Sequence, residues 1–306
     1  MAALLGDPAA RYFSEGFKHF DLRITSFDRT DSTISGMLHA NYHGPTRPRD
    51  EAVHLGSIEY LALALRLGSI SLNHVGRIGL ADISRSFMSS YSIKVQETIH
   101  LGEIPFSCTL LSSERDMKSL QGSRAYFEVT VGANKMTMGV DHRGGGRYRK
   151  LPEEEVMYPK HEQMHSLGYR YSEVEIDQVS VEPLLSKISA VVSYGSRLEE
   201  NILRGFTSAR ELLLPTDATQ VFGQLMQALL YEMDGTDRNK CANIWLRKME
   251  LSNTWPTRMS PCEAEVTFGR IRRVTKDGRQ WQLIELSGIV GSYEGKFEVA
   301  HEILSL

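Results

Sequence analysis

The chain has 306 residues, of which 41% are hydrophobic and 24% are charged, and it carries a net charge of -3. This composition is ordinary for a soluble globular protein of about two domains, and it argues against a disordered chain and against a general nucleic-acid binder, which usually has a strong basic excess. Three cysteines at no metal-like spacing favour a reducing compartment. Because no apolar stretch reaches the ~20 residues that span a bilayer and residues 1–7 lack the basic start of a signal peptide, we expect a cytoplasmic protein with neither nucleic acid nor membrane as a partner.

The first half of the chain predicts two strands, one buried helix and four further strands. The helix is expected at residues 53–67, where apolar residues at helical spacing cover nearly every face. The strands are expected at residues 17–25, 33–39, 92–101, 106–112, 125–131 and 135–140.

The second half repeats this order of elements. Its helix is expected at residues 217–233, and an insertion of helical character at 199–213 precedes it. The strands are expected at residues 173–179, 187–193, 242–251, 263–270, 280–289 and 296–303.

Short matches between the halves recur at a nearly constant offset. Ile34 matches Ile188 and Cys108 matches Cys262, both at an offset of 154 residues, and Glu59 of the first helix matches Asp217 of the second at 158. The stretch 124–131 matches 279–286 at an offset of 155. We interpret this pattern as a tandem duplication.

One long helix among mostly successive strands favours an α+β architecture, in which an antiparallel sheet wraps around the helix, over a doubly wound parallel sheet. Each half resembles the hotdog fold, so the duplication implies a double hotdog. We expect a first hotdog at 1–143, a linker at 144–168 and a second hotdog at 169–306. The edge-to-edge pairing common among hotdog sheets can then form within one chain, as a monomer or a homodimer.

The starts of the two helices carry the candidate chemistry. His54-Leu-Gly-Ser-Ile-Glu59 and Pro215-Thr-Asp-Ala-Thr-Gln220 each place a carboxylate in or near a first helical turn. The free N–H groups there can hold a thioester carbonyl or its oxyanion, and a partly buried carboxylate beside them can act as acid or base. We therefore predict Glu59, Asp217, His54 and His43 as catalytic residues, and Gly56, Gln220 and His39 as substrate-binding residues.

Structural explanations for the same residues stay open. Asp217 and Gln220 also fit a capping box in which Asp217 is the cap, and Glu59 is favoured near a helix start by the dipole alone. His54 can simply pack at the helix start. His39 would lie at a strand end and His43 in the following loop.

Two other motifs are weak. Residues 142–147 (His-Arg-Gly-Gly-Gly-Arg) lack the Lys-Ser/Thr of a phosphate loop and read as linker. His161 and His165 satisfy His-Glu-x-x-His, but Pro159 before them and Gly168 after them leave only about two helical turns, too short for a zinc protease. We expect no metal and no cofactor.

The helix-start acids resemble those of the dehydratase domains of polyketide synthases, in which the second helix opens with an Asp and a nearby Gln. The usual His-Pro before that Asp is replaced here by Leu214-Pro215. The whole chain is more similar to the avirulence protein D (AvrD) family, through Arg11-Tyr-Phe-Ser-Glu-Gly-Phe-Lys18, His54-Leu-Gly-Ser-Ile-Glu59 and the spacing of the later strands. It is also similar to the A-factor synthase (AfsA) family of hotdog enzymes.

These resemblances imply an enzyme that transfers or condenses a 3-ketoacyl group, held as an acyl carrier protein or coenzyme A thioester, with a ketopentose-like polyol. The product would be a butenolide or syringolide-type signal. A dehydratase or thioesterase on the same thioesters is one alternative, and a non-catalytic module that binds an acyl signal is another.

Overall fold

The computed structural model describes residues 5–6, 11–44, 52–115, 121–144, 147–157, 168–196, 212–235, 244–254 and 260–303. Within these ranges, no helix is long and apolar enough to cross a membrane. The predicted insertion at 199–213 falls almost wholly outside the described residues, as do His161, His165 and two of the glycines of the 142–147 motif.

The first lobe is an antiparallel half-sheet that encloses helix α2 (Ser57–His74). Its strand order is β1-β2-β4-β5-β6-β3, and α2 connects β2 to β3. The short helices η2 (Gly16–His19) and α3 (Leu80–Ile83) flank it. The strands are β1 (Phe20–Arg29), β2 (Thr33–Tyr42), β3 (Phe87–Lys94), β4 (Gly102–Arg115), β5 (Ser123–Val131) and β6 (Asn134–His142).

The second lobe repeats this plan around helix α5 (Pro215–Asp234). Its order, β7-β8-β10-β11-β12-β9, is the same when the strands are counted from the start of the lobe. The strands are β7 (Ser172–Glu182), β8 (Lys187–Ser196), β9 (Ile244–Asn253), β10 (Cys262–Lys276), β11 (Arg279–Val290) and β12 (Tyr293–Ile303). The double hotdog predicted from the sequence is therefore confirmed.

In the chain, α4 (Glu153–Met157) and η4 (Gly168–Tyr171) come between the strands of the first lobe and those of the second. The short helix η5 (Pro183–Leu185) joins β7 to β8. The buried guanidinium of Arg66 on α2 donates to the carbonyls of Val156 at 3.1 Å and Leu22 at 2.7 Å. This contact holds α4 against the first lobe. The predicted domain boundaries stay a prediction.

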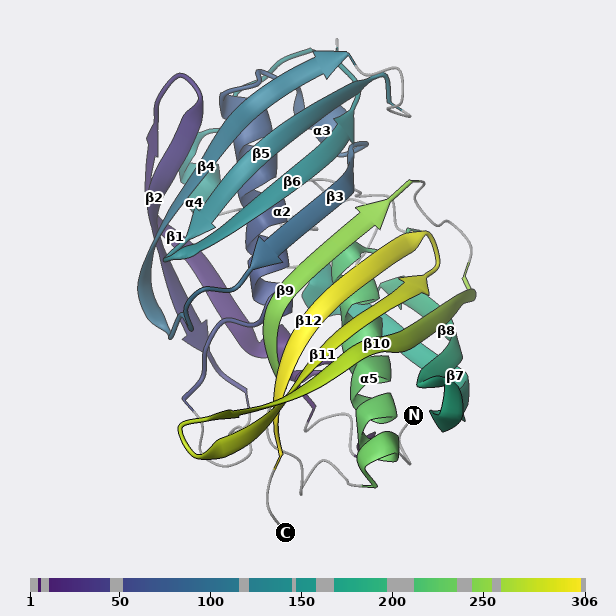
Figure 1. Ribbon diagram of the computed structural model, residues 1–306. Coiled ribbons are helices and arrows are strands. Elements are labelled where there is room, and N and C mark those ends of the chain that lie inside the picture. Colours follow the sequence, from purple (N-terminus) through teal and green to yellow (C-terminus); the bar gives the residue numbers. More distant parts are fainter. Residues whose placement is uncertain are drawn as a thin grey trace.

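The core of each lobe is its central helix. Every residue of α2 is buried, which agrees with the predicted helix that is apolar nearly all round. Figure 1 shows α2 behind β4–β6 and β3, and α5 behind β9–β12, so each half-sheet covers one helix. The two helices also contact each other.

The two half-sheets join edge to edge into one sheet of 12 strands. β3 pairs antiparallel with β9, from Ser90 opposite Ser252 to Lys94 opposite Lys248. Tyr91, Ile93 and their partners are buried along this seam. The duplication thus satisfies within one chain the sheet pairing that was expected for hotdog halves.

The bounds of the elements differ most from the prediction at α2 and β3. α2 extends to His74 rather than residue 67, because Ser69, Ser71 and Asn73 interrupt the apolar pattern although they are buried. β3 spans Phe87–Lys94 rather than 92–101, because the chain turns at Gln96 and Glu97, whose N–H groups donate to Asn134 Oδ1.

Candidate functional site

A carboxylate occupies the third position of each central helix and folds back onto the residue before the helix. Gly56 N–H donates to Glu59 Oε2 at 2.7 Å, and Leu214 N–H donates to Asp217 Oδ2 at 3.1 Å. Glu59 is 0% exposed and Asp217 is 3% exposed. Both acids therefore satisfy a backbone donor that the helix itself leaves unpaired.

Each carboxylate also accepts a hydrogen bond from a hydroxyl group outside its helix. Tyr12 donates to Glu59 Oε2, and Ser172 at the start of β7 donates to Asp217 Oδ1, both at 2.5 Å. The two lobes thus repeat one arrangement, in which a buried acid at a helix start is held by a backbone N–H and a hydroxyl.

Burial changes the acidity of Asp217. Loss of solvent contact raises its pKa from 3.8 to about 6, although Ser172, the Leu214 N–H and the charge of Lys18 act in the opposite direction. Lys18 Nζ lies near because it donates to the Ser172 carbonyl at 2.9 Å. A carboxyl group with a pKa of about 6 can both give and take a proton near neutral pH.

An N-terminal segment, residues 11–13, forms hydrogen bonds with both central helices, α2 and α5. Arg11 Nη1 donates to Gln224 Oε1 on α5 at 3.1 Å, and Gln224 Nε2 donates to the Phe13 carbonyl at 2.8 Å. Tyr12, between them, reaches Glu59 on α2. The segment therefore couples the position of one carboxylate to the other lobe.

The sequence did not predict Tyr12 or Ser172 as part of this site. Their contacts with Glu59 and Asp217 join residues 47 and 45 positions apart, and such contacts leave no periodic pattern. Tyr12 belonged to a motif that had been singled out only for its family resemblance.

The predicted substrate-binding residues at the helix starts are both close to the acids. At Gly56, the space that a Cβ would fill is taken by the Tyr12 hydroxyl and Glu59 Oε2. Gln220 is 3% exposed, and its Oε1 accepts no hydrogen bond within the described part of the chain.

The expected capping box at Asp217 needs a correction. The residue before the helix is Leu214, with Pro215 first in the helix, so Asp217 is the third helical residue and not the cap. The Asp217 carboxylate accepts a hydrogen bond from the N–H group of Leu214, the residue before the helix. Gln220 lies about one turn further along α5 and takes no part in this capping interaction.

The three predicted histidines lie in different surroundings. His54 is partly buried and stacks on Trp245 of β9, with ring centroids 5.0 Å apart, so it lies where the lobes meet. His39 Nδ1 is 2.9 Å from Glu103 on the sheet surface, and His43 is exposed. The hydrogen bonds that the structure gives to His39 and His43 do not lead to Glu59 or Asp217.

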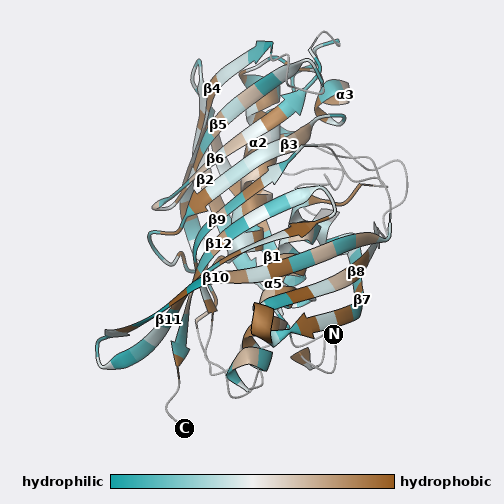
Figure 2. Ribbon diagram, turned by 45° about the vertical axis from the view of Figure 1, so that its right-hand side comes forward, coloured by the Kyte–Doolittle hydropathy of each residue, from teal (hydrophilic) through white to brown (hydrophobic). Residues whose placement is uncertain are grey.

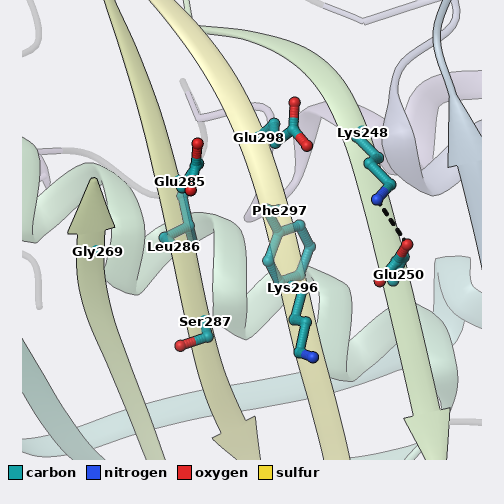
Figure 3. Close-up of a pocket in the computed structure, with 9 residues that line it drawn as sticks. All are labelled: Lys248, Glu250, Gly269, Glu285, Leu286, Ser287, Lys296, Phe297 and Glu298. Atoms are coloured by element: carbon teal, nitrogen blue, oxygen red, sulfur yellow. Dashed lines mark ion pairs between the residues drawn. The ribbon is translucent and has the colours of Figure 1, made fainter. Parts of the chain in front are cut away.

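A separate hollow of about 300 Å³ lies over the strands of the second lobe, and Figure 3 shows its lining. Two of its charged side chains, Lys248 and Glu250, form an ion pair at 2.7 Å. The residues that donate hydrogen bonds to the two helix-start acids do not line this hollow; they are Tyr12, Gly56, Ser172 and Leu214. Among the described residues, no cluster of three or more His, Cys, Asp or Glu side chains could hold a metal ion.

A duplicated half-sheet around a central helix, with a buried acid opening each helix, defines a protein of the double-hotdog class. Residues 2–303 match the family model of the Pseudomonas avirulence D protein (AvrD), and the chain belongs to this family.

Solved structures of similar fold have little sequence in common with this chain. A conserved hotdog protein of unknown function from Alicyclobacillus acidocaldarius is 8% identical, with 97% of this chain and 99% of that chain covered and a TM-score of 0.45. A putative thioesterase from Novosphingobium aromaticivorans is 12% identical (92% and 99% covered, TM-score 0.42). A trans-AT polyketide synthase dehydratase domain from Brevibacillus brevis is 13% identical (92% and 97% covered, TM-score 0.40). No curated protein matches the sequence.

Proposed function

We propose that this protein is an enzyme that acts on a 3-ketoacyl thioester and joins the acyl group to a ketopentose-like polyol. The observation that carries the proposal is the buried acid at the start of each central helix, which places a proton acceptor beside unpaired backbone N–H groups. Membership of the AvrD family supports the same substrate class, through the synthesis of syringolide-type signals that the family resemblance implies.

The two helix starts differ in a way that suggests different roles. α5 opens with Pro215, which has no N–H group, whereas α2 opens with Ser57 and Ile58, which both have one. α2 therefore offers more donors to a thioester oxygen. Asp217, with its pKa of about 6, is the better proton acceptor.

The proposed reaction begins when Asp217 takes the proton of an acceptor hydroxyl, whose oxygen then attacks the thioester carbonyl. The resulting oxyanion is stabilised by the N–H groups that open α2. When the carbonyl re-forms, the carbon–sulfur bond breaks, and the thiol leaves with the proton returned by Asp217. The product of this step is a 3-ketoacyl ester of the polyol.

Ring closure follows at the acidic carbon between the two carbonyls of that ester. A base removes one proton from this carbon, the carbanion adds to the ketone of the pentose unit, and the resulting alkoxide takes the proton back from the base. The hydroxyl formed in this way then leaves as water together with the second proton of the same carbon, which gives a butenolide. We assign this base to Glu59, with His54 or His43 as the partner in proton transfer. His54 is favoured because it is partly buried, whereas His43 is exposed.

Polar recognition of the acceptor would fall to Gln220, since its buried Oε1 lacks a donor in the described structure. Leaving such an atom without a partner costs on the order of 1–3 kcal/mol, which an acceptor hydroxyl would recover. Gly56 and His39 remain predicted binding residues. The proposal needs no metal and no cofactor.

The test is incubation of the protein with a 3-ketoacyl thioester, with and without a ketopentose, followed by mass spectrometry of the products. Glu59→Gln and Asp217→Asn keep an oxygen that can accept the capping hydrogen bond, so the fold should persist while the condensed product disappears. Glu128→Gln, at a surface ion pair with Lys135, is the control and should turn over normally. Unchanged turnover in both site variants would rule out the assignment.

The same spectra separate the alternatives. A thioesterase would release free acid without any sugar acceptor, and a dehydratase would remove water from a hydroxyacyl thioester. A binding module would show tight binding of the acyl product and no turnover of any thioester.

A further inference from the structure

The hairpin between β10 and β11 extends beyond the rest of the sheet. β10 pairs with β8 only from Cys262 to Thr267, and the alternation of buried and exposed residues ends at Phe268. Every residue from 269 to 280 is exposed. Both ribbon views place the turn of this hairpin clear of the body of the protein (Figures 1 and 2). We call residues 269–281 the arm.

The arm is strongly basic although the protein is acidic overall. It has one acidic residue, Asp277, so its formal charge is +4, and the remainder of the chain carries -7 against the total of -3. The cations are Arg270, Arg272, Arg273, Lys276 and Arg279.

Only part of this charge is neutralised locally. Arg272 lies 3.4 Å from Glu285 and Arg279 lies 3.5 Å from Glu302, both at the surface. Within the described residues, Arg270, Arg273 and Lys276 form no ion pair. Exposed pairs of this kind are weak, so the arm presents a positive surface to solvent.

The duplication provides an internal comparison. At the 155-residue offset, the equivalent of the arm in the first-lobe hairpin between β4 and β5 is residues 114–126, whose net charge is only +1. Its charged residues are Glu114, Arg115, Asp116, Lys118 and Arg124. The fold therefore does not require a strongly basic hairpin at this position. Its charge in the second lobe needs a different explanation.

Apolar side chains lie among the cations. Ile271 and Val274 are each 40% exposed. Val274 lies opposite Trp281 and Lys276 opposite Arg279, so these four side chains share one face of the hairpin. Arginine and aromatic residues are enriched in protein–protein interfaces, and the arm combines four arginines with the exposed apolar side chains and the partly buried Trp281.

We propose that the arm docks an acidic carrier protein that delivers the acyl thioester. This inference rests on the proposed function and names the partner for it. An extended polyanion such as nucleic acid would also contact the rest of the protein, whose charge of -7 would repel it. A small acidic protein can bind to the arm without contacting that negative surface. Complementary charge would act mainly on the rate of encounter and would weaken with salt.

The test compares one 3-ketoacyl group on two carriers, an acyl carrier protein and a short pantetheine thioester. In the variant Arg272→Glu/Arg273→Glu/Lys276→Glu, we expect kcat/KM for the protein-bound substrate to fall at least tenfold, mainly through KM. The value for the pantetheine thioester should stay within twofold. The matched control, Arg115→Glu/Lys118→Glu in the first-lobe hairpin, should behave as the unmodified protein with both substrates.

Equal kcat/KM of the arm variant and the unmodified protein with carrier-bound substrate would overturn the inference, as would an equal loss with both substrates. Direct binding of a fluorescently labelled acyl carrier protein, measured by anisotropy, separates this inference from the proposed function. If no thioester is turned over, the proposed function fails. The inference that the arm docks a carrier protein is still supported if the arm variant binds acyl carrier protein at least tenfold more weakly than the unmodified protein. Absence of binding to the unmodified protein, or equally tight binding of duplex DNA or anionic vesicles, would overturn it.

Discussion

At the scale of single residues, the position of Asp217 gives it two roles that do not conflict. Its Oδ2 caps the start of α5 and its Oδ1 accepts from Ser172, yet burial still raises its pKa to about 6. Capping alone would favour the ionised form and lower the pKa. Desolvation is therefore the larger effect.

This balance predicts how the stability depends on pH. Between about pH 4 and pH 6 the folded protein keeps a proton on Asp217 that the unfolded chain, with a pKa near 3.8, has released. The folded state binds more protons in this window, so the free energy of unfolding falls as the pH rises through it. A shift of about two units corresponds to about 3 kcal/mol.

Urea unfolding of the unmodified protein and of Asp217→Asn across pH 4 to 7 measures this effect. We expect the unmodified protein to lose about 2–3 kcal/mol relative to the variant over that range. A constant difference between the two proteins would show that Asp217 is not shifted.

At the scale of elements, the segment 11–13 depends on a glycine in the middle of α5. A Cβ at Gly223 would lie 2.6 Å from the ring of Phe13, closer than real Cβ atoms approach their neighbours. Glycine is unfavourable inside a helix, and here it leaves room for the segment that carries Tyr12 to Glu59.

The substitution Gly223→Ala therefore sets two effects against each other. Helix propensity favours alanine by about 1 kcal/mol, whereas overpacking against Phe13 costs about 1–3 kcal/mol. We expect a net loss of stability of about 1 kcal/mol, together with reduced turnover because Tyr12 is displaced.

A double-mutant cycle measured by thermal or urea unfolding tests this explanation. In a Phe13→Ala background the clash is absent, and Gly223→Ala should become neutral or stabilising by up to about 1 kcal/mol. Loss of the same size in both backgrounds would contradict a contact between the two residues.

At the scale of the whole molecule, the seam between β3 and β9 makes the two lobes one folding unit. Its central pairs, Tyr91 with Leu251 and Ile93 with Met249, are buried. β3 is paired on both sides, with β6 and with β9, so neither lobe has an open sheet edge there.

Ile93→Pro tests this coupling, because proline removes a backbone donor from a strand that is paired with a neighbour on each side. Hydrogen exchange followed by mass spectrometry should show lost protection in β9 as well as in β6. The control is Asp177→Pro, beside a register shift in the edge strand β7, which should leave the seam protected. Loss confined to the first lobe would mean that the lobes open independently.

The sequence by itself determined the features that repeat at short range. Recurring strands and the offsets near 154 residues predicted the duplication and the double hotdog, and apolar residues on nearly every face predicted that the first helix is buried. The acids at the helix starts were found because helix ends have a local signature in the chain. These signals depend on neighbours a few residues apart.

The tertiary structure decided what depends on residues far apart. It brought Tyr12 to Glu59 and Ser172 to Asp217, stacked His54 on a tryptophan of the other lobe, and buried Asp217 deeply enough to change its acidity. It also moved the cap of α5 from Asp217 to Leu214 and placed β3 earlier in the chain than its pattern indicated. Burial and hydrogen bonding between distant segments are set by how whole lobes pack, and no local pattern of residues records that packing.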